Sequence, residues 1–130
     1  MLEKDITPAI LRAMRDDPRF GSGFVEVKVA RGEKLQKGQL AEHQYRALQL
    51  ATSVGGVYFK IPDCGFQNPC DAVILKKAEG WLVVVFEVKS AGTKKPTREV
   101  WAIPVRELGF FPVSISLSSA RERGLRVPLE

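Results

Sequence analysis

Glu26, Val27 and Lys28 place a carboxylate and an ammonium two positions apart within an apolar, β-branched run over residues 24–29. Residues two apart in a β-strand project from the same face of the sheet, so the two charges share one face. A carboxylate oxygen is a ligand that Mg²⁺ prefers, and a nearby cation can position a water or neutralise developing negative charge. The pair has the chemistry for phosphodiester hydrolysis, although such charges also decorate half-exposed strands with no catalytic role.

A glutamine on the following helix is the next candidate. Helical spacing predicts an apolar stripe from Leu40 to Ala51 on a helix over residues 38–53, and Gln44 lies in the middle of it. An inward-facing amide needs hydrogen-bond partners. Three interpretations follow: Gln44 is a satisfied core residue, the helix is rotated so that Tyr45 points inward, or Gln44 reaches the charged face of the preceding strand.

This order of motifs resembles the PD-(D/E)XK nuclease superfamily, in particular the Holliday-junction resolvases of archaeal type and their phage relatives. The resemblance covers roughly residues 24–105. It is carried by the segments Glu26-Val27-Lys28, His43-Gln44 and Gly55-Gly56-Val57-Tyr58-Phe59. A Pro-x-Asp ending at Asp71 also looks like the start of the next strand in small phage-borne resolvase-like proteins. The resemblance implies a restriction-endonuclease-like fold, which is α/β with a mixed β-sheet flanked by helices.

One departure from the superfamily concerns its first metal-binding acid, which precedes the Glu-x-Lys strand. This chain has only Asp16, Asp17 and a glycine-containing linker at that place. We therefore assign this acid to Asp71, with Asp16 or Asp17 as the fallback. The resemblance then implies that Glu26 and Asp71 bind Mg²⁺ together with the main-chain carbonyl of Val27, and that Mn²⁺ can substitute.

The same resemblance implies roles for the remaining site residues. Lys28 would position or activate the attacking water, and Gln44 would orient substrate or water. The single histidine, His43, has no ligand spacing around it and is expected to face solvent or contact phosphate. The implied activity is a magnesium-dependent, structure-selective DNA endonuclease that cleaves the phosphodiesters of four-way junctions.

A second Glu-x-Lys pair, Glu87 and Lys89, follows Asp71 in the conventional order of the signature and is the better local match. However, residues 90–96 contain glycine and proline and cannot begin the helix that normally packs behind the site. The first pair has that helix, with its glutamine in place. We therefore favour the first pair and keep Glu87 and Lys89 as the alternative catalytic pair.

The charge of the chain favours a polyanionic partner. Lysines and arginines number 20 against 15 acidic residues, a net charge of +5. Four basic residues near the start of the long helix are candidate contacts to the DNA backbone, or else part of a solvated loop: Arg31, Lys34, Lys37 and Arg46. A non-catalytic DNA-binding module of the same fold, or a nuclease acting on linear or damaged DNA, are the alternative functions.

Cutting two opposed strands of a junction suits a twofold homodimer. Apolar residues near the C-terminus would form the interface or cap the core: Leu108, Phe110, Phe111 and Val113. With 130 residues the chain fits one domain over residues 1–130. Its two cysteines are expected to be reduced thiols, and no apolar run is long enough to span a membrane, so we expect a cytoplasmic protein.

The elements that must position these residues follow from periodicity and turn signals. A first helix is predicted from a Thr7 cap and Pro8 to the Asp16-Asp17-Pro18 stop, and strands over 24–30 and 56–61 are expected to be parallel around the long helix. Residues 71–75 and 81–86 are expected to form a hairpin whose strands are covered on both faces. A strand over 100–103 and a helical turn over 118–123 complete the prediction.

Overall fold

The computed structural model describes residues 3–62, 70–88 and 97–129. A four-stranded sheet lies at its centre, in the order β1-β5-β6-β8, with β1 parallel to β5 and the other pairs antiparallel. The strands of this sheet are β1 (Gly23–Val29), β5 (Glu79–Val88), β6 (Thr97–Pro104) and β8 (Leu125–Arg126). The prediction of a mixed sheet flanked by helices is therefore confirmed.

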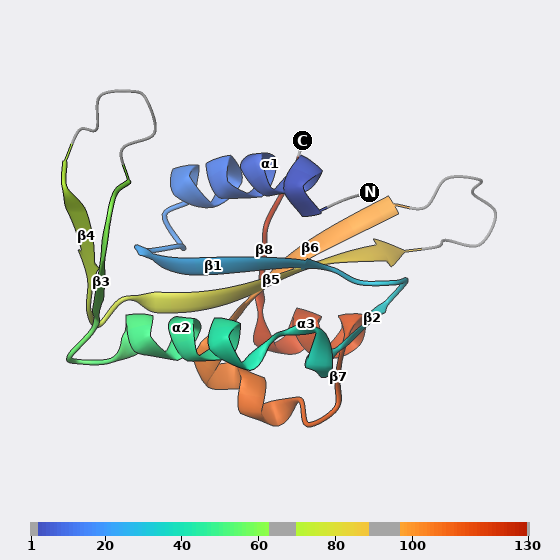
Figure 1. Ribbon diagram of the computed structural model, residues 1–130. Coiled ribbons are helices and arrows are strands. Elements are labelled where there is room, and N and C mark those ends of the chain that lie inside the picture. Colours follow the sequence, from blue (N-terminus) through green and yellow to red (C-terminus); the bar gives the residue numbers. More distant parts are fainter. Residues whose placement is uncertain (1–2, 63–69, 89–96, 130) are drawn as a thin grey trace.

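Helices cover both faces of the sheet (Figure 1). One face carries α1 (Glu3–Asp16), and the other carries α2 (Glu42–Thr52) and α3 (Leu117–Arg123). Short elements extend the second layer: β2 (Lys34–Gln36), η1 (Lys37–Gln39), η2 (Val105–Phe110) and β7 (Ser114–Ser116), with β2 paired to β7. A separate hairpin of β3 (Val57–Lys60) and β4 (Ala72–Leu75) stands at one end of the sheet.

Strand β5 is the centre of both apolar cores. Its side chains from Trp81 to Phe86 are all buried, as the continuous apolar run predicted. Leu82, Val84 and Phe86 contribute to the core under α2, and the alternating residues between them contribute to the core under α1. Burial on both faces fixes β5 as an inner strand and leaves the more polar β1 at the edge.

The first helix begins earlier than predicted. Helix α1 starts at Glu3, so Thr7 is not its cap, and Pro8 lies inside the helix. Acidic residues in the first turn complement the helix dipole, and Ile6, Ile10 and Met14, four residues apart, bury one face against the sheet. This burial outweighs the single hydrogen bond that Pro8 cannot donate. The predicted stop before Pro18 is confirmed.

The predicted helix over 38–53 is two elements. Leu40 and Ala41 have extended backbone, with ψ of 108° and 152°, and separate η1 from α2. The extended Ala41 is the N-cap of α2, so the helix begins at Glu42 and Gln44 lies in its first turn. This break decides where the Gln44 side chain can reach.

The predicted pairing of two strands is wrong. The strand that runs parallel to β1 is β5, and β3 instead pairs antiparallel with β4. Consequently the expected hairpin of residues 71–75 with 81–86 does not form either. The reason is burial: three of the four residues of β3 are exposed, whereas β5 is buried on both faces and takes the inner position.

An ion pair joins α3 to the sheet and gives a pH prediction. Arg121 donates to both carboxylate oxygens of Glu99, and the indole N–H of Trp101 donates to Oε1 at 3.1 Å. The Arg121 hydrogen bonds, assisted by Trp101, hold the pKa of Glu99 below its ordinary value of 4.5 despite its partial burial. A depressed carboxyl pKa contributes stability above the ordinary value, and this stability is lost as the pH falls through the folded-state pKa.

We therefore expect Arg121→Ala to lower the free energy of unfolding at pH 7 and to reduce its further decline as the pH falls below 4.5, the ordinary value of the carboxyl pKa. Urea denaturation at pH 7 and below pH 4.5 measures this. Arg12→Ala on α1 is the matched control, because it removes an exposed arginine on the other face of the sheet. Equal pH profiles for wild type and Arg121→Ala would contradict the assignment.

Candidate functional site

Three predicted residues meet between β1 and α2; we call Glu26, Lys28 and Gln44 the Glu26 cluster. Gln44 Nε2 donates a hydrogen bond to Glu26 Oε1 at 2.9 Å. Lys28 Nζ lies 3.4 Å from the same oxygen. One carboxylate oxygen therefore accepts a hydrogen bond from a neutral amide and also forms an ion pair with a lysine. A strand and a helix hold the three side chains together.

Strand β1 places both charges on the face under α2. The even-numbered positions from 24 to 30 share one face of the sheet, and on that face Phe24 and Ala30 pack into the apolar core beside Glu26 and Lys28. The Glu26 and Lys28 side chains are only 28% and 14% exposed, so solvent screens their ion pair less than it screens a surface pair. The strand alternation predicted from the sequence is confirmed.

The N-terminus of α2 orients Gln44. Its Oε1 accepts a hydrogen bond from the backbone N–H of Ala41 at 3.0 Å, which satisfies one of the free donors of the first turn. With that oxygen occupied, the amide nitrogen is turned toward Glu26. The third interpretation of the sequence is confirmed, since Gln44 reaches the charged strand while Tyr45 packs against the core beside it.

A glycine in β5 sets the distance between α2 and the sheet. A Cβ atom on Gly80 would lie 2.3 Å from the backbone oxygen of Leu48, so the helix rests directly on the strand. The end of α2 is held as well, because the N–H groups of Lys77 and Ala78 donate to the carbonyls of Ser53 and Ala51. Gly80 lies between the two strands of the hairpin expected from the sequence, and nothing in the local pattern indicates this role.

A cavity of about 390 Å³ opens beside the Glu26 cluster. Its lining consists of Phe24, Val25, Glu26, His43, Gln44, Ala47 and Leu48. His43 is exposed, as expected, and contributes to the wall next to Glu26 and Gln44. The cavity gives the half-buried carboxylate a path to solvent and space for a small polar group.

The backbone carbonyl of Val27 lies on the open edge of the sheet. The N–H of Ala30 donates to the carbonyl of Val85, and the carbonyl of Ser22 accepts from the N–H of Glu79. The even-numbered residues of β1 therefore turn their backbone groups toward β5. Val27 has the opposite parity, and β1 is an edge strand of the four-stranded sheet. Its carbonyl therefore points away from β5 and toward the open edge of the sheet. A carbonyl that serves as the predicted metal ligand must point in this direction, because the carbonyls that point toward β5 are used in strand pairing.

Asp71 is not brought to the Glu26 cluster. It precedes β4, is exposed, and accepts through its backbone oxygen from the N–H of Ile61. Val57 pairs with Leu75 at the end of the hairpin from which the chain continues to α2 and to β5. Asp71 precedes Ala72, the partner of Lys60, and so lies at the opposite end of the hairpin. Within the described ranges, no three His, Cys, Asp or Glu side chains lie together as metal ligands. The position of Asp71 therefore does not support a metal site shared by Glu26 and Asp71, and that site remains a prediction.

Glu87 of the alternative pair lies on the other face of the sheet. Glu87 alternates with Phe86 and Val88, which belong to the core under α2, and so it projects toward the α1 side. Glu26 and Glu87 therefore cannot contribute to one site. Lys89 lies outside the described residues.

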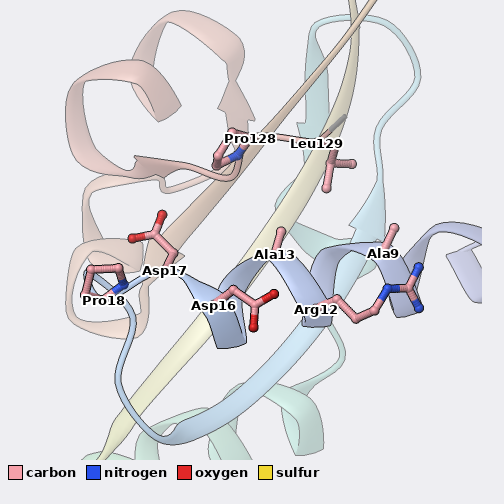
Figure 2. Close-up of a pocket in the computed structure, with 8 residues that line it drawn as sticks. All are labelled: Ala9, Arg12, Ala13, Asp16, Asp17, Pro18, Pro128 and Leu129. Atoms are coloured by element: carbon pink, nitrogen blue, oxygen red, sulfur yellow. The ribbon is translucent and has the colours of Figure 1, made fainter.

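The fallback acids lie beside a different pocket, also on the α1 side. Figure 2 shows Asp16 and Asp17 at the end of α1, next to a cavity of about 620 Å³ that extends to Pro128 and Leu129. Arg15 and Arg19 pair with the two carboxylates and hold the pKa of each below its ordinary value, chiefly through hydrogen bonds. The sheet separates both acids from the Glu26 cluster.

The four predicted DNA contacts differ in their availability. Arg31, Lys34 and Arg46 are exposed, and Arg46 forms only a 3.8 Å surface pair with Glu42. Lys37 is partly buried and donates to the backbone oxygen of Leu108 at 2.9 Å. In the described part of the chain, Lys37 is the only one of the four whose side chain donates a hydrogen bond to the backbone.

The apolar residues near the C-terminus divide between core and surface. Leu108 and Phe111 are buried and cap the core under α2, while Phe110 and Val113 are 60% and 70% exposed. Only Phe110 and Val113 of this set are accessible to a second subunit.

Over the residues described, no helix is both long and apolar enough to cross a membrane. Comparison with protein-family models, curated proteins and solved structures finds no match to this chain.

Proposed function

We propose that this chain is a magnesium-dependent, structure-selective DNA endonuclease of PD-(D/E)XK type that acts on four-way junctions. The supporting observation is the Glu26 cluster: one carboxylate, one lysine and one oriented glutamine around a single oxygen, beside a cavity at the sheet edge. Each member was selected from sequence spacing, and the fold brings them together through separate elements.

The residues of the cluster fit a weakly held magnesium ion. Mg²⁺ usually keeps several waters and takes one or two carboxylates together with substrate phosphate oxygens. The Glu26 carboxylate and the edge carbonyl of Val27 would hold it here. Bound there, Mg²⁺ would polarise the scissile phosphodiester and neutralise the charge that develops on it.

The side chains of the cluster have separable tasks. Lys28 supplies a positive charge beside Glu26, where it would position the attacking water and stabilise negative charge on the phosphate. Gln44 keeps the Glu26 carboxylate in place and presents an amide to the cavity. The arrangement is held before substrate arrives, so little reorganisation is needed during the reaction.

The proposed DNA partner agrees with the charge of the molecule. The net charge is +5, and the exposed Arg31, Lys34 and Arg46 are available to contact phosphates. A homodimer would present two such sites to opposed strands of a junction, with Phe110 and Val113 available for the interface.

A gel cleavage assay tests the proposal. A synthetic four-way junction and a linear duplex of the same sequence are incubated with Mg²⁺, with Mn²⁺ or with chelator. We expect symmetric nicking of the junction with either metal and none with chelator. Cleavage of the duplex alone would favour a nuclease for linear or damaged DNA.

Binding without cleavage would favour a non-catalytic DNA-binding module. One observation supports that alternative, namely the position of Asp71 on a hairpin outside the four-stranded sheet. Light scattering of the same sample reports whether the active species is a dimer.

A further inference from the structure

The β3–β4 hairpin carries an exposed aromatic and aliphatic pair on a two-stranded ribbon. Tyr58 and Ile74 are directly opposite in the antiparallel register, and they are 73% and 71% exposed. The other face of the ribbon turns toward the protein, since the Phe59 ring lies 5.8 Å from the Phe24 ring of β1. Tyr58 and Ile74 therefore form a projecting surface, which we call the Tyr58 face.

Three lysines flank the residues of the Tyr58 face in the sequence. Lys60 follows Tyr58 by two positions on the same face of β3, and Lys76 and Lys77 come directly after β4. All three are exposed. In the described part of the chain, none of the three forms an ion pair with a carboxylate. An aromatic ring with unpaired cations beside it matches the combination that binds single-stranded nucleic acid, in which bases stack on the ring and lysines contact phosphates.

The charge pattern argues against a second copy of this chain on the same surface. A twofold interface places the same patch on both subunits, so it would bring these lysines close to their own symmetry mates. Like charges brought together disfavour such a contact. A polyanion has the complementary charge.

We propose that the Tyr58 face is a stacking surface for unpaired nucleotides, with Lys60 contacting the adjacent phosphate. The choice of a nucleic-acid partner rests on the proposed function. The inference adds a binding surface on the hairpin, separate from the Glu26 cluster, that selects DNA with unstacked bases.

Fluorescence anisotropy in chelator, with a labelled single-stranded oligo(dT) and a blunt duplex, tests the stacking. Tyr58→Ala should weaken oligo(dT) binding at least about fivefold, the lower end for loss of one stacked base, with little effect on the duplex. Tyr58→Phe should bind like wild type, because it keeps the ring. Leu11→Ala, which removes an exposed apolar side chain from α1, is the matched control and should bind normally.

The salt dependence of binding tests the phosphate contact. Lys60→Gln should reduce the slope of log K against log salt by about 0.7 for the single strand. Lys4→Gln on α1 is the control. Unchanged oligo(dT) binding by Tyr58→Ala, equal losses on duplex and single strand, or conversion of a dimer to a monomer by Tyr58→Ala would each overturn the inference.

The result is independent of catalysis. Tyr58-dependent binding with no junction cleavage would uphold this inference and defeat the proposed function. Normal junction cleavage together with normal oligo(dT) binding by Tyr58→Ala would do the reverse.

Discussion

Replacing Glu26 with glutamine is expected to lower magnesium-dependent junction cleavage by at least about 100-fold, the scale for losing one preorganised catalytic group. Glutamine has the size of glutamate, so the contact to Gln44 can persist while the negative charge that would hold the metal is lost. Lys28→Ala should have a similar effect through loss of the positive charge beside Glu26. Junction binding should change little, because Arg31, Lys34 and Arg46, the proposed contacts to the rest of the DNA backbone, lie outside the cluster.

The measurement is a single-turnover cleavage rate, with junction affinity determined in parallel by anisotropy. Glu122→Gln is the matched control, since it removes an exposed carboxylate on α3. Glu87→Gln tests the alternative pair through its one described member, which lies on the opposite face of the sheet. Full cleavage by Glu26→Gln together with loss in Glu87→Gln would move the active site to the α1 side.

Local periodicity brought the members of the Glu26 cluster to facing surfaces, but it left open whether Gln44 reaches the charged strand. The period of two placed Glu26 and Lys28 on one face, and the helical period placed Gln44 on the inward side of the next helix. Both periods are set by residues that are close together in the chain. They still place the side chains correctly although the predicted helix is interrupted at Leu40 and Ala41.

Strand pairing depended on competition between distant segments and was not predicted correctly. Residues 57–60 and 81–86 both had strand character, and the local sequence around each segment does not determine which one pairs with β1. The fully apolar segment took the buried position, and the segment with Tyr58 and Lys60 stayed exposed. Asp71 was expected to begin a strand next to β1, but that strand pairs with β3, so Asp71 lies on the exposed hairpin away from Glu26.

Gly80 links the geometry of the Glu26 cluster to the close packing of the α2 backbone on β5. A Cβ at this position would meet the backbone oxygen, carbon and Cα of Leu48 at 2.3, 2.8 and 2.9 Å. None of these atoms belongs to a flexible side chain, so α2 must move away from β5. The shift would separate Gln44 from Glu26, because one is on the helix and the other on the strand next to β5.

We therefore expect Gly80→Ala to lower the free energy of unfolding by about 1–3 kcal/mol, the usual cost of overpacking, and to reduce junction cleavage as well. Gly109→Ala is the matched control, since a Cβ there has no atom within 4 Å. Glycine-to-alanine changes at unstrained, open positions usually stabilise a protein slightly by restricting the unfolded chain. Urea denaturation should then show opposite signs for the two variants. Equal stability of Gly80→Ala and Gly109→Ala would mean that α2 does not rest on β5 at this glycine, and the cluster would need another explanation for its geometry.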